Sequence, residues 1–198
     1  MSFRIEEKIF ILKKNLILFK NYLINNKAEK LFEPRIINSI YFDNDNFQMF
    51  EDSEEGIVPR KKIRIRHYNH DGYSLLEKKI SSGEGRFKTS NRISIKKDYY
   101  LKYGLLDDTY GLCKPKVKVS YLRSYYKFNK FRITIDENIS YQKFFYINNK
   151  FKKNLSEEVV VEVKSNNLSN YNDFEKNFPF TKVRFSKYSK AISSIYNY

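Results

Sequence analysis

Residues 60–68 read RKKIRIRHY, and their alternation decides how the chain folds. Isoleucine that alternates with polar residues indicates a β-strand. Because successive side chains of a strand point to opposite faces, Arg60, Lys62, Arg64 and Arg66 share one face and the two isoleucines share the other. The stretch therefore predicts a strand with one apolar face and one face of four cations.

The same alternation recurs along the chain and predicts seven further strands, near residues 3–11, 36–43, 74–80, 86–95, 116–126, 130–138 and 158–164. Helical spacing of apolar residues predicts helices at 13–26, 97–106, 168–177 and 187–196. Residues 44–56, NDNFQMFEDSEEG, are interpreted as a polar loop. Short connections favour antiparallel pairing. We therefore predict a single α+β domain over residues 1–198, built on an antiparallel eight-stranded β-barrel with flanking helices.

Composition is typical of a folded protein with a sizeable core, since 41% of the 198 residues are hydrophobic and 17% are aromatic. No apolar run approaches the roughly 20 residues that a membrane helix needs. The first ten residues, MSFRIEEKIF, carry acids where a signal peptide needs cations, so we expect a soluble, cytoplasmic protein. The single cysteine, Cys113, excludes an internal disulfide and a cysteine-cluster zinc site.

The formal net charge of +15 calls for an anionic partner, although an AT-rich coding bias would also raise the lysine content. The placement of the charges is more informative. Several strands carry E-x-K or R-x-R units at alternate positions, as in LLEKKI and VVVEVK. These are either the wet faces of an ordinary sheet or the lining of a barrel lumen. A cationic lumen would need an anion such as a phosphate chain, and its few carboxylates would suit a divalent metal that bridges phosphate oxygens.

At this point the order of motifs resembles the polyphosphate polymerase domain of the vacuolar transporter chaperone (VTC) family, which belongs to the triphosphate tunnel metalloenzymes. The resemblance extends through nearly the whole chain and rests on FRIEEKIFI, RIINSIYFDN, RKKIRIRHY, LLEKKI followed by GRFK, VKVSYLRSYY, FRITIDENISY, VVVEVK and RFSKYSKA. It implies an antiparallel eight-stranded tunnel whose interior binds a triphosphate chain.

The resemblance also implies roles for individual residues. The residues implied to hold the triphosphate, and thus to be catalytic, are Arg64, Arg66, Arg123 and Lys187. Its implied phosphate-binding residues are Lys8, Lys79, Lys88, Tyr121, Arg132, Arg184 and Ser186. Glu162 resembles the metal-binding glutamate, which would hold Mn²⁺ or Mg²⁺ together with water and phosphate oxygens. Glu6 and Glu77 are either second metal ligands or partners that steady Lys8 and Lys79, and the second interpretation is preferred.

The implied reaction transfers the γ-phosphate of ATP to the end of a growing polyphosphate chain. Such phosphoryl transfer needs positioning and charge stabilisation more than a side-chain nucleophile, and the sequence offers no catalytic triad. No membrane partner can be named from the sequence.

Three alternatives stay open. A triphosphatase would use the same tunnel with water as acceptor, but such relatives carry E-x-E-x-K on the first strand, where this chain has Arg4 in place of the first glutamate. A nucleic-acid-binding domain would bind through backbone charge without a metal, and is the less favoured partner class. A polyphosphate-binding module would bind the polymer without turnover.

Overall fold

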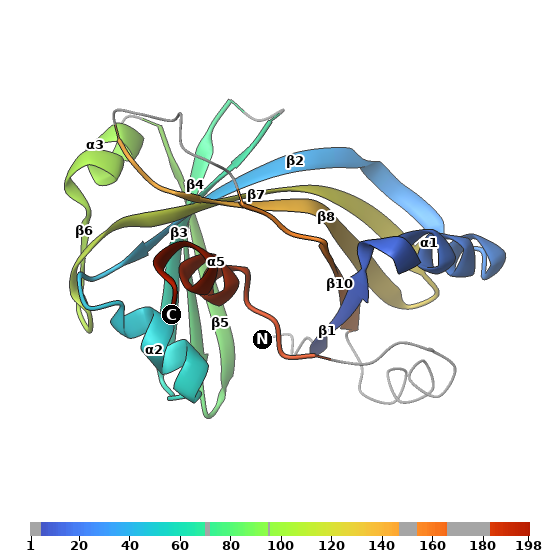
Figure 1. The fold of residues 1–198 in the computed structure, drawn as a ribbon, viewed down its shortest axis with the longest axis horizontal. Helices are drawn as coiled ribbons and strands as arrows, with labels where there is room; N and C mark the ends of the chain where they lie inside the picture. Colours follow the sequence, from blue (N-terminus) through green and yellow to red (C-terminus); the bar gives the residue numbers. More distant parts are fainter. Residues whose placement is uncertain (1–4, 70–71, 95, 147–153, 166–182) are drawn as a thin grey trace. The chain divides into compact units, whose positions relative to one another are not determined.

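The computed structural model describes residues 5–69, 72–94, 96–146, 154–165 and 183–198 (Figure 1). The described helices are α1 (Leu16–Asn25), α2 (Gln48–Glu55), α3 (Lys96–Tyr103) and α5 (Lys187–Tyr196), and a 3₁₀ turn at Lys13–Asn15 precedes α1. The strands are β1 (Ile5–Leu12), β2 (Glu29–Asp43), β3 (Arg60–Tyr68), β4 (Ser74–Ser82), β5 (Gly85–Ile93), β6 (Leu105–Asp107), β7 (Gly111–Phe128), β8 (Phe131–Lys143), β9 (Asn154–Leu155) and β10 (Glu158–Ser165).

Hydrogen bonding joins eight main strands in the order β1-β10-β8-β7-β2-β3-β4-β5, with β6 beside β7 and β9 beside β8. The pairs β1–β10, β10–β8, β2–β3, β3–β4 and β4–β5 are all antiparallel. The fold is therefore α+β with an antiparallel sheet, as the sequence predicts. The hydrogen-bonded path ends at β1 and β5 in the described part of the chain, so closure into a barrel stays a prediction.

The chain divides into two compact units. The first comprises Met1–Ile36, Tyr121–Ile139 and Leu155–Phe185, and the second comprises Ile37–Ser120, Ser140–Asn154 and Ser186–Tyr198. Strands β2, β7 and β8 contribute residues to both units. The single domain over residues 1–198 stays a prediction.

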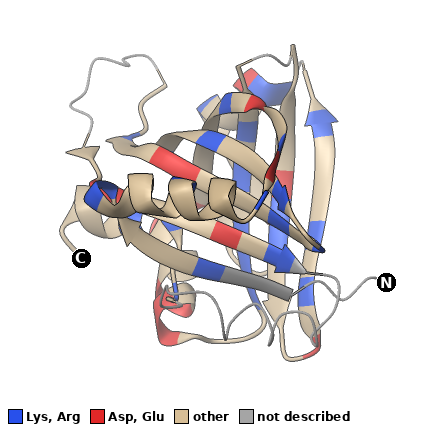
Figure 2. Ribbon diagram, turned by 90° about the vertical axis from the view of Figure 1, so that its right-hand side faces the viewer, with Lys and Arg blue, Asp and Glu red and all other residues tan. Residues whose placement is uncertain are grey.

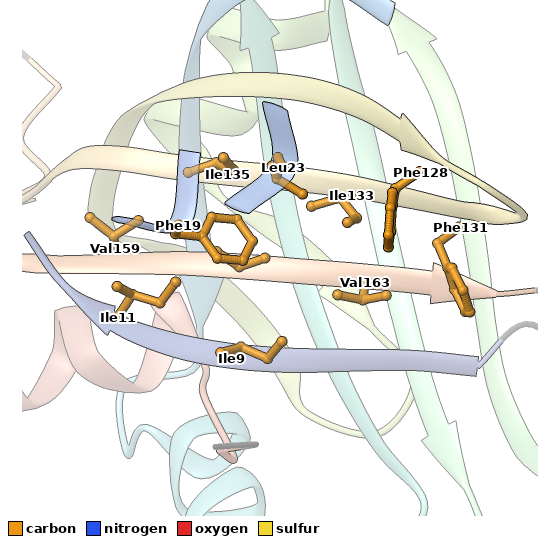
Figure 3. Packing of buried hydrophobic residues seen from close by; sticks show 11 residues of the cluster. Ile9, Ile11, Phe19, Leu23, Phe128, Phe131, Ile133, Ile135, Val159 and Val163 are labelled. Carbon is orange, nitrogen blue, oxygen red and sulfur yellow. The ribbon is translucent and has the colours of Figure 1, made fainter. Parts of the chain in front are cut away.

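In the first unit, α1 packs on one face of the sheet formed by β1, β10 and β8 (Figure 3). Phe19 and Leu23 of α1 are buried against odd-numbered apolar residues of these strands, which include Ile9, Val161 and Ile133. Even-numbered residues such as Lys8, Glu162 and Lys164 point to the other face. Alternation thus separates a mainly apolar, helix-covered face, on which Glu137 pairs with Lys20 of α1, from a charged face.

In the second unit, the strand predicted from RKKIRIRHY coincides with β3, Arg60–Tyr68. Ile63 and Ile65 are 0% and 2% exposed, whereas the cations lie on the opposite face. Figure 2 shows lysine and arginine in bands along the strands of the sheet. The two-faced strand expected from the sequence is confirmed.

The other predicted strands all correspond to observed ones, with β2, β7 and β8 longer than expected. The helix predicted at 187–196 coincides with α5, and those at 13–26 and 97–106 correspond to α1 and α3. The helix predicted at 168–177 lies outside the described residues. No helix in the described part of the chain is both long and apolar enough to cross a membrane.

The polar-loop interpretation of residues 44–56 is wrong, because Gln48–Glu55 form the helix α2. The helix is too short for its periodicity to stand out, and its start is stabilised from outside. The carboxylate of Asp43 accepts hydrogen bonds from the backbone N–H groups of Met49 and Phe50, both at 3.0 Å. The same carboxylate accepts a bond from the Tyr188 hydroxyl of α5.

Gly104 explains why α3 stops at Tyr103 and a strand follows. Its φ of +86° lies in the left-handed region, and a Cβ at this position would lie 2.5 Å from the carbonyl oxygen of Cys113. Only glycine fits both requirements. Gly111 has a φ of +67° but open space around its Cβ position, so it shares the first requirement only.

We predict that Gly104→Ala lowers the free energy of unfolding by about 3 kcal/mol, through backbone strain and the clash together. Gly111→Ala, the matched control, should cost about 1 kcal/mol from backbone strain alone. Urea unfolding followed by circular dichroism measures both. Equal losses in the two variants would contradict the role given to the contact with Cys113.

Candidate functional site

The charged face of the second unit is a patch in which cations of three neighbouring strands stand side by side. Lys62 of β3 lies opposite Lys79 of β4, and Lys79 lies opposite Lys88 of β5. Like charges directly opposite one another are destabilising. The strand registers therefore build a site that favours an anion.

One buried carboxylate organises these cations. Glu77 is 2% exposed, and its Oε2 accepts a hydrogen bond of 2.6 Å from Nε of Arg64 and lies 3.6 Å from Nη1 of Arg66. Its Oε1 forms an ion pair with Lys88. Burial alone would raise the pKa of Glu77, but the charges of Arg64, Arg66 and Lys88 outweigh it and lower the pKa to about 2. The carboxylate is therefore ionised at neutral pH and holds three of the predicted phosphate-binding residues.

Tyr41 and Ser39 of β2 belong to this patch, although neither was predicted from the sequence as a site residue. The Tyr41 hydroxyl accepts a 2.9 Å hydrogen bond from Nη1 of Arg64, and the Ser39 hydroxyl accepts one of 3.4 Å from Nε of Arg66. Burial would raise the pKa of Tyr41, but Arg64, Arg66 and Lys187 lower it below its ordinary value. The alternation of SIYF could have pointed to these side chains, because it places Ser39 and Tyr41 on one face.

The start of α5 also contributes to this patch. Ser186 caps the helix by accepting from the backbone N–H of Ser189, and its hydroxyl accepts a 2.8 Å hydrogen bond from Nζ of Lys62. Tyr188 stacks on Tyr41 with ring centroids 5.3 Å apart. The structure therefore brings Ser186 and Lys187 to the same patch as Arg64.

The charged face of the first unit holds Glu162, which lies opposite Lys8 of β1 on one side and Thr134 of β8 on the other. Nζ of Lys164 is 3.4 Å from Oε2 of Glu162. Lys8 donates a 2.7 Å hydrogen bond to the carbonyl oxygen of Phe185. The buried Thr134 hydroxyl has no hydrogen-bond partner among the described residues, and the sequence analysis missed it. Lys8, Glu162 and Thr134 thus form a polar row across three strands, with the predicted metal ligand Glu162 in the middle.

Arg123 is fixed on the same face by a bidentate ion pair. Its Nε and Nη2 donate to the two carboxylate oxygens of Asp136 at 2.5 and 2.7 Å, and its Nη2 lies 4.0 Å from Glu162. Burial would lower the pKa of Arg123, but Asp136 foremost among its neighbours raises it well above the ordinary value. The guanidinium also lies 5.3 Å from the ring centroid of the buried Tyr121. Arg123 is therefore a permanently charged group held in one orientation.

The remaining two predicted residues of this unit are more exposed. Arg132 lies opposite Lys164, and its guanidinium is 5.7 Å from the Tyr125 ring centroid. Arg184 is exposed and follows Val183, whose backbone N–H donates to the Lys8 carbonyl oxygen. Both add positive charge to the first unit.

The protein groups around Glu162 suit a metal ion only if phosphate oxygens supply further ligands. No group of three or more His, Cys, Asp or Glu side chains that could hold an ion occurs among the described residues. Glu162 supplies one carboxylate, and lysine and arginine surround it. Mg²⁺ commonly binds one or two carboxylates plus substrate phosphates and waters. Glu162 therefore fits an ion that enters with a phosphate chain, and does not fit one held by the protein alone.

Glu77 should be essential to the stability of its unit. Removing its charge leaves Arg64, Arg66 and Lys88 without their shared anion, so we expect Glu77→Gln to cost about 3 kcal/mol. The exposed Glu33, which pairs with Lys30 at 3.0 Å, provides the control, and Glu33→Gln should change stability by less than about 0.5 kcal/mol. Urea unfolding at neutral pH measures both variants, and similar losses would contradict the assignment.

Glu77→Gln should also change how the free energy of unfolding depends on pH. Because the pKa of Glu77 is lowered to about 2 from its ordinary 4.5, its contribution is complete above pH 4.5 and is lost as the pH falls towards 2. The wild-type protein should lose stability over this range more steeply than Glu77→Gln.

Comparisons with solved structures place the fold. A Bacillus halodurans protein, suggested to be an adenylate cyclase, superposes with a TM-score of 0.65 at 14% identity, covering 99% of this chain and 100% of that one. A Vibrio parahaemolyticus protein with the same suggested activity has a TM-score of 0.59 at 17% identity, with 97% and 98% covered. An adenylyl cyclase candidate from Hippeastrum, described as having a dominant triphosphatase activity, has a TM-score of 0.56 at 15% identity, with 97% and 96% covered. These identities establish a shared fold only.

A search of curated proteins finds no match. The VTC domain family matches residues 3–110 and 105–196, which together span nearly the whole chain. The order of motifs, the antiparallel sheet and the two charged faces agree with this match. The chain therefore belongs to the VTC domain family.

Proposed function

We propose that this protein is a metal-dependent polyphosphate polymerase that transfers the γ-phosphate of ATP to a growing polyphosphate chain. The observation that supports it most is the register of Lys62, Lys79 and Lys88, which places three cations in one row across three strands. A linear polyanion matches such a row better than a single small anion does. Membership of the VTC domain family supports a phosphate or triphosphate substrate.

The proposal keeps the closed eight-stranded barrel expected from the sequence, whose interior would carry the charged faces. Arg64, Arg66, Arg123 and Lys187 would hold the triphosphate. The other proposed contacts to phosphate are made by Lys8, Lys79, Lys88, Tyr121, Arg132, Arg184 and Ser186. Glu162 would hold Mn²⁺ or Mg²⁺ together with phosphate oxygens, and the bound ion supplies positive charge that neutralises phosphate.

In the proposed reaction, a terminal oxygen of the acceptor chain forms a bond to the γ-phosphorus of ATP. At the same time, the bond between the γ-phosphorus and the oxygen that bridges it to the β-phosphorus breaks. ADP leaves and the chain is longer by one phosphate. The protein's part is to align donor and acceptor and to stabilise charge on the transferred group. Arg64 and Arg123 suit this part because Glu77 and Asp136 already fix their orientation, so little reorganisation is needed when phosphate binds.

Arg64 is held in a fixed orientation by its neighbours. Its Nε donates to Glu77 and its Nη1 donates to the Tyr41 hydroxyl, at 2.6 and 2.9 Å. Its side chain is 22% exposed, so it is neither fully buried nor loosely solvated. These properties suit a preorganised phosphate clamp.

The test is incubation of purified protein with ATP and Mn²⁺ or Mg²⁺, with and without a short polyphosphate primer. Gel separation of the polymer and a parallel assay of free phosphate measure the products. We expect polymer growth that Glu162→Gln reduces by about 10²-fold or more. Glu158 lies on the same face of β10 as Glu162 and is the control, so Glu158→Gln should keep the wild-type rate.

Each other outcome identifies a different function. Free phosphate without polymer would make the protein a triphosphatase, the activity described for the Hippeastrum protein of similar fold. Tight, salt-sensitive binding of nucleic acid without a metal and without turnover would make it a binding domain. Binding of polyphosphate alone would make it a polymer-binding module.

Arg64 and Arg60 offer a matched comparison, because both lie on the same face of β3. Arg64→Ala should lower kcat/KM for polymer synthesis by about 10²–10³-fold, the typical effect of losing one electrostatic stabiliser. Arg60 donates to the backbone carbonyls of Gly56 and Ile57, at 3.2 and 2.7 Å, and is not a proposed phosphate contact. Arg60→Ala should lower the rate by less than about tenfold. Comparable losses would mean that bulk positive charge, and not a specific clamp, drives the reaction.

A further inference from the structure

The helix α1 exposes large apolar residues on the side that faces away from the core. Phe19 and Leu23 point into the core of the first unit and are 0% and 1% exposed. On the outer side, Ile17, Leu18 and Ile24 are 69%, 65% and 67% exposed. Single exposed apolar residues are ordinary, but three on one short helix, beside the exposed Asn21 and Asn25, are more than a fully solvated helix side usually carries. The outer side of α1 therefore calls for a partner.

The segment that contains α1 carries charge of one sign, although the exposed Glu29 and Glu157 lie next to its two ends. Residues 13–28 contain four lysines and no acidic residue. Lys13 and Lys14 are exposed before the helix, and Lys27 is exposed after it. The fourth, Lys20, pairs with Glu137 at 3.1 Å. We name the α1 surface as the exposed residues Leu12, Lys13, Lys14, Ile17, Leu18, Asn21, Ile24, Asn25, Asn26 and Lys27.

The α1 surface is independent of the charged face described above. The odd-numbered strand residues of the first unit face α1, while Lys8 and Glu162 point to the opposite face of the sheet. In Figure 2, which turns the side of the molecule that carries α1 in Figure 1 towards the viewer, a long helical ribbon with little charge lies in front. Phosphate chemistry on the other face leaves these apolar residues unexplained.

We infer that the α1 surface binds the surface of an anionic lipid bilayer. Ile17, Leu18 and Ile24 would enter the boundary between headgroups and acyl chains, and the lysines at both ends of the helix would contact lipid phosphates. Exposed apolar side chains combined with flanking lysines are the properties of helices that lie in the plane of a membrane interface. Ile17 and Ile24 are two helical turns apart, so they lie on one side of the helix and can enter the bilayer together.

A second copy of this chain is a poorer partner for the same surface. A two-fold dimer places the same patch of both copies face to face. The lysines at the two ends of α1 would then lie against lysines of the other copy. An anionic lipid surface satisfies the apolar and the cationic residues at once.

The experiment is co-sedimentation of the full chain with vesicles of phosphatidylcholine and phosphatidylglycerol, compared with vesicles of phosphatidylcholine alone. We expect binding that is at least about tenfold stronger to the anionic vesicles and that weakens as salt is raised. The triple variant Ile17→Ser, Leu18→Ser and Ile24→Ser should bind at least about tenfold more weakly. Leu155→Ser, at another residue of the first unit that is 76% exposed, should bind like the wild type.

The serine variant separates the proposal from general attraction to a basic protein, because it keeps every lysine. If it binds anionic vesicles as tightly as the wild type, other cations are responsible and the proposal fails. Equal binding to both kinds of vesicle, or to neither, also overturns it. A wild-type dimer in size-exclusion chromatography that becomes monomeric in the serine variant would assign the surface to a second copy instead.

The chain contains no tryptophan, so one introduced residue reports its own surroundings. Ile24→Trp should shift its fluorescence to shorter wavelength on anionic vesicles and be quenched by brominated acyl chains. Leu155→Trp should show neither effect. An unshifted Ile24→Trp signal in protein that does sediment with the vesicles would place the contact elsewhere on the chain and overturn the assignment to α1.

Discussion

Like charges lie directly opposite one another on neighbouring strands of this sheet, and buried carboxylates reduce the electrostatic repulsion between them. In the second unit, Glu77 is shared by Arg64, Arg66 and Lys88. In the first unit, Asp136 holds Arg123. Each carboxylate offsets part of the repulsion and leaves the face around it net positive. These faces still favour an anion, because their carboxylates in the described part of the chain are too few to neutralise the cations.

The carboxylates also fix the geometry of the arginines. A free arginine side chain loses rotamer entropy when it binds phosphate. In Arg64 and Arg123 that loss has already occurred on folding, because Glu77, Tyr41 and Asp136 hold the guanidinium groups. Under the proposed function, an arriving phosphate would then meet oriented donors. The same contacts would set a limit, since the phosphate would have to share these arginines with a resident carboxylate. A bound divalent ion next to Glu162 would reduce the resulting repulsion between carboxylate and phosphate.

The sequence was most informative where the local spacing of apolar residues decides the secondary structure. The two-faced alternation of RKKIRIRHY predicted β3 with its observed ends, and helical spacing did the same for α5. It failed at α2, whose start depends on Asp43 and, through it, on Tyr188, a residue 145 positions away along the chain. Tyr41 and Thr134 were missed for a related reason, because their polar surroundings come from other strands. The predicted phosphate-binding residues Lys79, Lys88, Ser186 and Lys187 do gather near Arg64, but the hydrogen bonds and ion pairs that hold this group are tertiary and leave no local pattern.

The separation of the two faces determines which substitutions the fold can absorb. Apolar burial on one face, as at Ile63 and Ile65, supplies most of the stability, and the cations contribute little to it. Removing one cation from a row of like charges relieves repulsion, so such a change acts mainly on ligand binding. Removing a buried carboxylate does the reverse, because the repulsion among the remaining cations is then unopposed. Cations and carboxylates on the same face therefore have opposite roles, and comparing stability with activity for each substitution separates the groups that bind phosphate from the groups that hold them in place.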